Sequence, residues 1–188
     1  MTNILNGIDI DRLVETINAI KQNPRLAHFK FRSETEWING GHSKTTIQGF
    51  RGADQEDISR EQPFIIEGDE PPILLGENKG PNAVELILAS LASCLSVGFV
   101  YNAAARGIKI ESLRFKVEGS LDLHAFLGLS GVWGIDTRPG YEKIIISYKV
   151  KSDASIEKLE ELCEYVKKTS PVLDIVCNKV SVIVDSEE

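Results

Sequence analysis

Cysteine is scarce in this chain of 188 residues, because its three cysteines, Cys94, Cys163 and Cys177, are too few and too far apart to form a disulfide framework. Basic residues are outnumbered as well: 21 Lys and Arg stand against 28 Asp and Glu, which leaves a net charge of −7 and no basic cluster. Nucleic acid and anionic membranes are therefore not expected as partners. Residues 1–7 lack the cationic start and apolar run of a signal peptide, so we expect a cytoplasmic protein with reduced thiols.

Signatures of several enzyme classes are also missing from the sequence. It contains no phosphate-binding glycine loop and no nucleophile elbow. His28 and His124 show no metal-ligand spacing with the cysteines, so we expect neither a metal nor another cofactor. Cys94 is left as the residue best suited to carry chemistry, and a thiol redox protein is the leading interpretation.

Cys94 lies in an uncharged span of 20 residues, from Leu86 to Ala105, which is long enough to cross a bilayer. Its serines, alanines and Asn102 dilute the apolar residues, which favours a core helix buried on all sides over a membrane span. Asn82 fits the N-cap and Glu85 the third helical position of a capping box, while Arg106-Gly107 supplies a stop.

Hydrophobic periodicity predicts an α+β fold around this long helix. Two further helices are expected, one capped by Asp9 or Asp11 and ending at Asn23-Pro24, the other capped by Asp153 or Ser155 and broken at Ser170-Pro171. The segments predicted as strands are 27–37, 44–48, 64–66, 108–121, 144–150 and 180–184, with a tight turn at Asn39-Gly40 and a loop over 52–57.

Residues 80–94, with the sequence GPNAVELILASLASC, are similar to the hallmark of the OsmC/Ohr family of osmotically inducible and organic hydroperoxide resistance proteins. The segments His124–Leu129, Arg138–Tyr141 and 155–184 resemble later parts of the family pattern, in the right order. The resemblance covers roughly residues 27–184. It divides the chain into an N-terminal helical extension, residues 1–25, and an OsmC-like domain, residues 26–188.

Such a resemblance implies a homodimer of intertwined subunits, in which long buried central helices are wrapped by a mixed sheet that both subunits share. It also implies thiol-dependent reduction of organic hydroperoxides during oxidative stress. Cys94 occupies the position of the cysteine that attacks the peroxide and becomes a sulfenic acid. In the family a second cysteine then forms a disulfide, and an external dithiol resets the pair.

Three departures from the family pattern concern the residues around that cysteine. The catalytic glutamate matches Val84, and Glu85 is displaced by one position, which places it on the helix face opposite Cys94 and favours a capping role. His42 stands where the peroxidases have an arginine, and we expect it to be a solvated turn residue. Ser170 stands before Pro171 where the family has its second cysteine, so the usual resolving thiol is missing.

Cys94, with Glu85, His42 and Ser170 as supporting candidates, is thus the predicted site. Cys163 and Cys177 are expected to be core residues, although either could resolve an oxidised Cys94 after a rearrangement. One hypothesis is a one-cysteine peroxidase that uses a small-molecule peroxide and an external thiol reductant. The alternative is a non-catalytic dimer of the same fold that binds a small apolar ligand, so whether the chain is an enzyme stays open.

Overall fold

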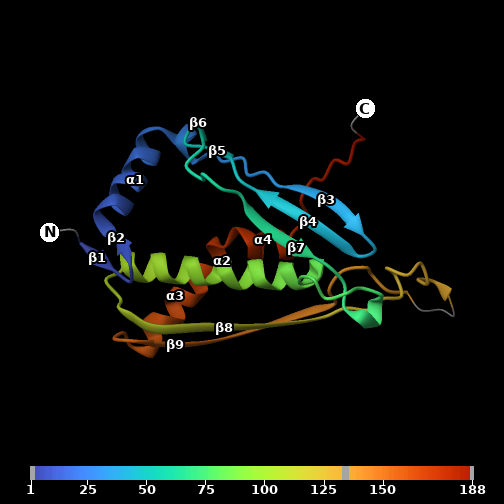
Figure 1. Ribbon diagram of the computed structural model, residues 1–188. Helices are drawn as coiled ribbons and strands as arrows, with labels where there is room; N and C mark the ends of the chain where they lie inside the picture. The colour runs from blue at the N-terminus through green and yellow to red at the C-terminus, as the bar shows by residue number, and fades with distance from the viewer. Residues whose placement is uncertain (1–2, 133–135, 187–188) are drawn as a thin grey trace. The chain divides into compact units, whose positions relative to one another are not determined.

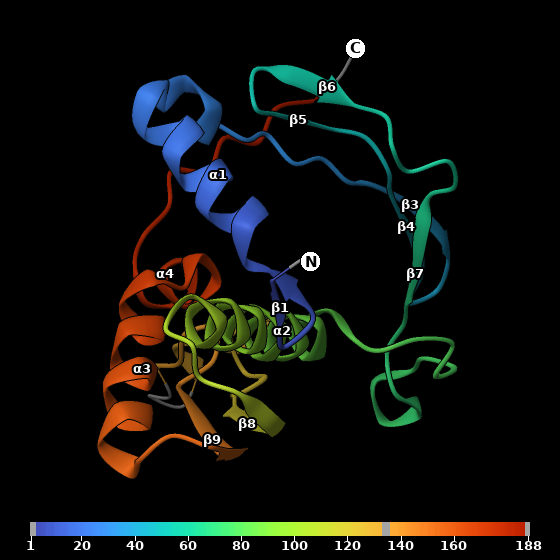
Figure 2. The ribbon, with the colours of Figure 1, turned by 90° about the vertical axis from the view of Figure 1, so that its left-hand side faces the viewer.

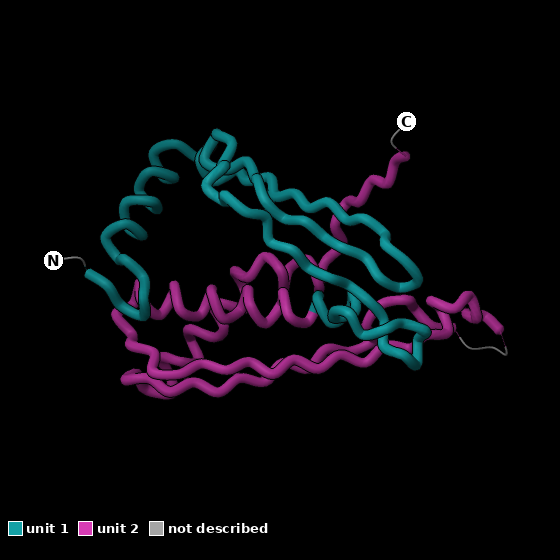
Figure 3. The backbone as a smooth tube through the Cα atoms, in the orientation of Figure 1, with its two compact units in different colours: residues 1–87 teal, residues 88–188 magenta. Residues whose placement is uncertain are grey.

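The computed structural model describes residues 3–132 and 136–186 of the chain. These residues form two compact units, Met1–Ile87 and Leu88–Glu188, which Figure 3 distinguishes by colour. The architecture is α+β, as the sequence predicts. The boundary between the units falls inside the long helix, so each unit is described by itself.

The first unit consists of one helix and short antiparallel strands. Its main sheet has the strand order β3-β4-β7 (Figure 1), and β5 and β6 form a separate hairpin. The elements are β1 (Ile4–Leu5), β2 (Ile8–Asp9), α1 (Ile10–Gln22), η1 (Pro24–Ala27), β3 (Glu34–Asn39), β4 (His42–Ile47), β5 (Phe50–Gly52), β6 (Gln55–Asp57), β7 (Phe64–Gly68) and η2 (Pro72–Leu74).

Turn chemistry explains both a correct and an incorrect prediction in this unit. The Asn39-Gly40 turn joins β3 to β4, with Gly40 at φ 56°, as expected. The segment predicted as a loop over 52–57 instead contains all of strand β6, which a turn at Ala53 and Asp54, both with positive φ, 49° and 64°, joins to β5. The first predicted strand, 27–37, begins only at Glu34 and is preceded by irregular chain with one bridge from Lys30 to Arg51.

Helix α2 (Ala83–Ala105) begins with the predicted capping box. The Asn82 side chain accepts the N–H of Glu85 at 3.0 Å, and the Glu85 carboxylate accepts the N–H of Asn82 at 2.9 Å. The helix ends before Gly107, whose φ of 69° is the left-handed conformation that glycine favours after a helix.

The second unit packs helices on one face of a long hairpin, as Figures 1 and 2 both show. Strands β8 (Ile110–Ser120) and β9 (Lys143–Ser152) pair antiparallel, and α3 (Ile156–Thr169) and α4 (Pro171–Cys177) follow them. Side chains alternate along both strands, so one face meets the helices and the other meets solvent. The buried core residues are Leu91, Leu95, Phe99, Ala103, Ile108, Leu162 and Val166.

Within the single chain, α2 is buried along one stripe rather than on all sides. Leu91, Leu95, Phe99 and Ala103 repeat every four residues and are at most 3% exposed. Val97, by contrast, is 54% exposed. By length and composition alone α2 could cross a membrane, and 17% of its most apolar window is buried within the chain.

The C-terminal part of the chain differs from the prediction in two ways. A short helix, α4, begins directly at Pro171, where the sequence predicts only a break, because proline is well suited to the first turn of a helix. Residues 180–184, predicted as a strand, form none with any of the described residues. Their apolar side chains are exposed, Val184 by 88%, since an extended segment needs a paired neighbour to become a strand.

Candidate functional site

Cys94 and Ser170, which are 76 positions apart in the sequence, lie side by side in the second unit. The Cys94 Sγ and Ser170 Oγ atoms are 3.2 Å apart, a hydrogen bond in which either atom can donate. Cys94 is half-buried on α2, and Ser170 is only 5% exposed. The structure thus brings together the two candidate residues that the sequence predicts for this part of the chain.

Close packing of α2 against α3 creates this pair. A side chain at Gly98 would place its Cβ 3.2 Å from Cγ1 of Val166, so the absence of a side chain there lets the helices approach. Gly98 and Val166 lie four residues from Cys94 and Ser170 respectively, which is about one helical turn. The Gly98–Val166 contact therefore supports the Cys94–Ser170 contact one turn away.

Ser170 also joins two helices. It is the residue at which α3 ends and the N-cap of α4, where its Oγ accepts the N–H of Leu173 at 3.3 Å. A serine hydroxyl has one hydrogen to donate and two lone pairs to accept. Ser170 can therefore cap α4 and donate to a Cys94 thiolate at the same time.

Glu85 performs the capping role that its position on the helix predicts. Its carboxylate bonds to the backbone N–H of Asn82 at 2.9 Å, and the side chain is exposed at the start of α2. The Asn82 side-chain amide, in turn, donates to the Glu70 carboxylate at 3.1 Å.

His42 is not the solvated turn residue that the sequence suggests. It is the first residue of β4, its side chain is only 16% exposed, and its Nε2 lies 2.7 Å from the Glu67 carboxylate on β7. The Nδ1 atom of His42 is buried and has no hydrogen-bond partner among the described residues. The expectation failed because the strand pairing that brings Glu67 beside His42 is not visible in local sequence.

Asp69 organises the loop between β7 and α2. It is 4% exposed, and its carboxylate accepts three backbone N–H groups, from Glu70 at 2.8 Å, Glu77 at 3.0 Å and Lys79 at 3.1 Å. The hydrogen bond from Lys79, assisted by those from Glu70 and Glu77, holds the pKa of Asp69 below its ordinary value against the opposing effect of burial.

The other two cysteines occupy different environments. Cys163, on α3, packs against the core as expected, and its interaction with the Tyr148 hydroxyl raises the pKa of Tyr148. Cys177, at the end of α4, is exposed, so the prediction that it is a core residue is wrong: the unpredicted helix α4 carries it to the surface. No group of three or more His, Cys, Asp or Glu side chains suited to a metal ion occurs among the described residues.

Sequence reasoning missed Glu67, Asp69 and Tyr148 as partners of titratable side chains. The alternation of strand 144–150 placed Tyr148 on the inward face, which was a usable signal. Asp69 stands between Gly68 and the prolines before α2, a turn-rich stretch in which an aspartate commonly binds backbone N–H groups. Nothing in the sequence around Glu67 indicated that it would pair with His42.

Fold and site define a small α+β protein with a half-buried helix cysteine held beside a serine hydroxyl. The family described as OsmC-like protein matches residues 76–185, more than half of the chain. The chain belongs to the OsmC-like family.

Solved structures show the same fold. An OsmC-like protein from Mycoplasma pneumoniae is 19% identical, with a TM-score of 0.56 over 79% of this chain and 87% of that one. An OsmC-like protein of unknown function from Vibrio cholerae is 12% identical, with a TM-score of 0.55 over 78% and 92% of the two chains. An organic hydroperoxide resistance protein OsmC from Legionella pneumophila is 15% identical, with a TM-score of 0.53 over 78% and 88%. No curated protein matches the sequence.

Proposed function

We propose that this protein reduces organic hydroperoxides through Cys94 and depends on an external thiol to restore it. The observation that carries the proposal is the 3.2 Å contact between Cys94 Sγ and Ser170 Oγ. Ser170 stands before Pro171, where the family resemblance places a second cysteine. A hydroxyl at that position can form a hydrogen bond with Cys94 but cannot form a disulfide with it.

The reaction balances with two thiols as the reductant. The Cys94 thiolate attacks one peroxide oxygen, so that an S–O bond forms, the O–O bond breaks and the alkoxide takes a proton and leaves as the alcohol. The external thiol then attacks the sulfenic sulfur, which forms an S–S bond and releases water. A second thiol reduces this mixed disulfide and regenerates Cys94.

Ser170 contributes to both stages of this reaction. Its hydroxyl donates to the thiolate before attack, while its lone pair keeps the N–H of Leu173 satisfied. After attack, the same hydroxyl lies within reach of the sulfenic acid. Because Ser170 is fixed as an N-cap, it needs no rearrangement between the two steps.

The assembly and location belong to the same proposal. We assign the protein as a cytoplasmic homodimer, with residues 1–25 as an extension of the OsmC-like domain. The apolar side of α2 that one chain leaves exposed, which includes Val97 at 54% and Tyr101 at 44%, favours coverage by a second copy. A core position for α2, rather than a membrane position, follows from that arrangement.

Trapping of the sulfenic acid tests the proposal. In a Cys163→Ser/Cys177→Ser chain, stoichiometric cumene hydroperoxide with dimedone should give one dimedone adduct per chain in the intact mass. The matched control adds Cys94→Ser and should give no adduct. An external thiol added before dimedone should remove the adduct.

Two outcomes contradict the proposal. Either no adduct forms, or an adduct persists after Cys94→Ser, in which case the trapped group is not the Cys94 thiol. The first result would favour the alternative function, a non-catalytic dimer that binds a small apolar ligand.

A further inference from the structure

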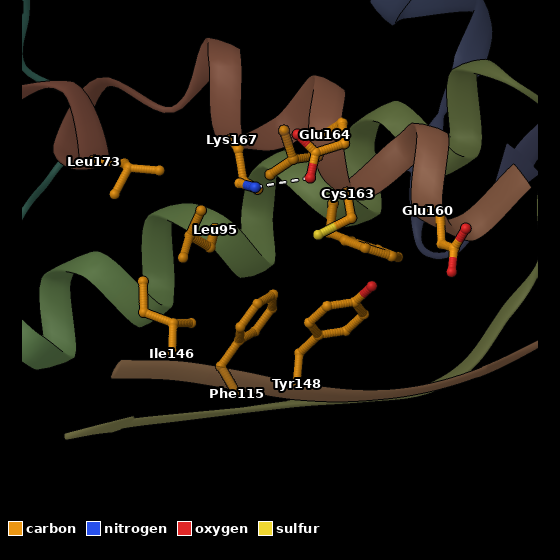
Figure 4. A pocket seen from close by; sticks show the side chains of 11 residues that line it. Leu95, Phe115, Ile146, Tyr148, Glu160, Cys163, Glu164, Lys167 and Leu173 are labelled. Carbon is orange, nitrogen blue, oxygen red and sulfur yellow. Dashed lines mark hydrogen bonds and ion pairs between the residues drawn. The ribbon is translucent and has the colours of Figure 1, made fainter. Parts of the chain in front are cut away.

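A cavity of about 590 Å³ lies inside the second unit, between the helices and the β8–β9 hairpin. Figure 4 shows side chains from α2, α3 and α4 facing side chains from the two strands across it. Its walls are formed by Leu95, Phe99, Phe115, Ile146, Tyr148, Glu160, Cys163, Glu164, Val166, Lys167 and Leu173. Neither Cys94 nor Ser170 is among them, so the cavity is separate from the proposed peroxide site.

Six of the eleven lining residues are apolar, and Tyr148 and Cys163 add a hydroxyl and a thiol. Tyr148 lies on β9 and Cys163 on α3, and the interaction of the phenol with the Cys163 side chain, together with burial, raises the pKa of Tyr148 to about 12. The phenol therefore stays protonated at neutral pH. A protonated phenol can donate its hydrogen to an oxygen acceptor within the cavity, in place of the weakly accepting Cys163 sulfur.

The remaining lining residues carry a net negative charge. Glu164 forms an ion pair with Lys167, in which Nζ lies 2.7 Å from Oε1, and Glu160 adds a second carboxylate. Two carboxylates and one ammonium leave one net negative charge in the lining. This charge opposes the binding of an anionic ligand.

We propose that this cavity binds a small uncharged molecule with an apolar skeleton and one hydrogen-bond acceptor, which accepts the hydroxyl hydrogen of Tyr148. A volume of about 590 Å³ is within the range of small-molecule sites. Apolar walls with a few convergent polar groups are the usual composition of such sites. The class of ligand follows from the lining. The aromatic and aliphatic walls favour an apolar skeleton, the Tyr148 hydroxyl favours one acceptor, and the net negative charge repels carboxylates.

Binding of a matched pair of probes tests this inference. We expect β-acetonaphthone, a neutral ketone, to bind in isothermal titration calorimetry, and β-naphthoate, which replaces the ketone by a carboxylate, to bind about tenfold more weakly or not at all. Tyr148→Phe should weaken binding of the ketone by about three- to tenfold, the loss of one hydrogen bond.

Two further variants locate the site. Leu173→Trp fills the cavity and should abolish binding, while Val176→Trp, on the same helix but outside the lining, should leave it unchanged. The Cys94→Ser/Cys177→Ser chain gives an independent readout, because bound ketone should slow alkylation of Cys163. The inference is overturned if the ketone does not bind, if naphthoate binds equally well, or if Leu173→Trp, shown to be folded by circular dichroism, still binds it.

Discussion

Ser170 serves the structure and the proposed chemistry with the same hydroxyl group. It accepts the N–H of Leu173 as the cap of α4 and contacts the Cys94 thiol at 3.2 Å. Because the side chain is 5% exposed, water does not readily replace either contact.

Substitution of Ser170 by alanine should therefore destabilise the protein. Loss of an N-cap costs about 1 kcal/mol in the free energy of unfolding. Chemical denaturation of Ser170→Ala and Ser155→Ala provides the comparison, since Ser155 caps α3 in the same way but does not contact Cys94. Both variants should lose stability, but only Ser170→Ala should change the reaction rate of Cys94 with cumene hydroperoxide. Equal peroxide rates in the two variants would contradict the role assigned to Ser170.

Asp69 should make stability depend on pH in the acid range. Its folded-state pKa is lowered, chiefly by the hydrogen bond from the Lys79 N–H, so it stabilises the fold above the ordinary aspartate pKa of about 3.9. That contribution is lost as the pH falls through the folded-state pKa. Asp69→Asn should thus be less stable than the unsubstituted chain at neutral pH, and the difference should shrink below about pH 4.

Urea unfolding at a series of pH values measures this difference. Asp185→Asn is the control, because Asp185 is exposed in the C-terminal segment. A stability difference for Asp69→Asn that stays constant from neutral to acid pH would contradict the interpretation.

At the residue scale, side chains that act within one turn of their own position were predictable. Asn82 and Glu85 satisfy each other across three residues, so their roles followed from spacing alone. The His42–Glu67 pair spans 25 residues and depends on how β4 pairs with β7, which local sequence does not encode. The proximity of Cys94 and Ser170 followed only from the family resemblance.

At the element scale, the α2–α3 contact holds the candidate site together. Gly98 allows Val166 to approach, and Cys94 and Ser170 meet one turn away. The long elements were predictable: β8 and β9 follow a clear period of two, and α2 is an uncharged apolar span bounded by a capping box and a glycine stop. The short β5–β6 hairpin was not, because its turn uses Ala53 and Asp54 in a conformation that those residues adopt infrequently.

A larger side chain at Gly98 should push α2 and α3 apart and so disturb the Cys94–Ser170 contact one turn away. Gly98→Leu places a side chain where a Cβ alone would already lie 3.2 Å from Val166, so overpacking should cost about 1–3 kcal/mol of stability. Glu161→Leu, at an exposed position on α3, is the control and should cost much less. Thermal unfolding compares the two variants, and equal melting temperatures would contradict the packing described for α2 and α3.

At the scale of the whole molecule, the exposed apolar surface supports the proposed homodimer. One side of α2 and residues 180–184 expose apolar side chains in the single chain, and large exposed apolar patches commonly mark interaction sites. The prediction of a strand over 180–184 failed because the β pattern is present but no described segment of the same chain pairs with it.

Analytical ultracentrifugation should find a homodimer. Val97→Lys, which places a charge on the exposed apolar side of α2, should shift the equilibrium toward monomer, while Ile156→Lys, at a 71% exposed position on α3, should not. A monomeric unsubstituted chain would exclude the proposed assembly but leave the Cys94 chemistry untested by this measurement.

The central claim is that Ser170 occupies the place of a resolving residue beside Cys94. Non-reducing intact mass of the Cys163→Ser/Cys177→Ser chain, with and without Ser170→Cys, tests it after oxidation by cumene hydroperoxide in the presence of dimedone. The chain with Ser170 should carry one dimedone adduct, whereas Ser170→Cys should lose two hydrogen atoms as a disulfide to Cys94 forms and should escape the trap. A Ser170→Cys chain that carries the same dimedone adduct, with no disulfide, would contradict the account.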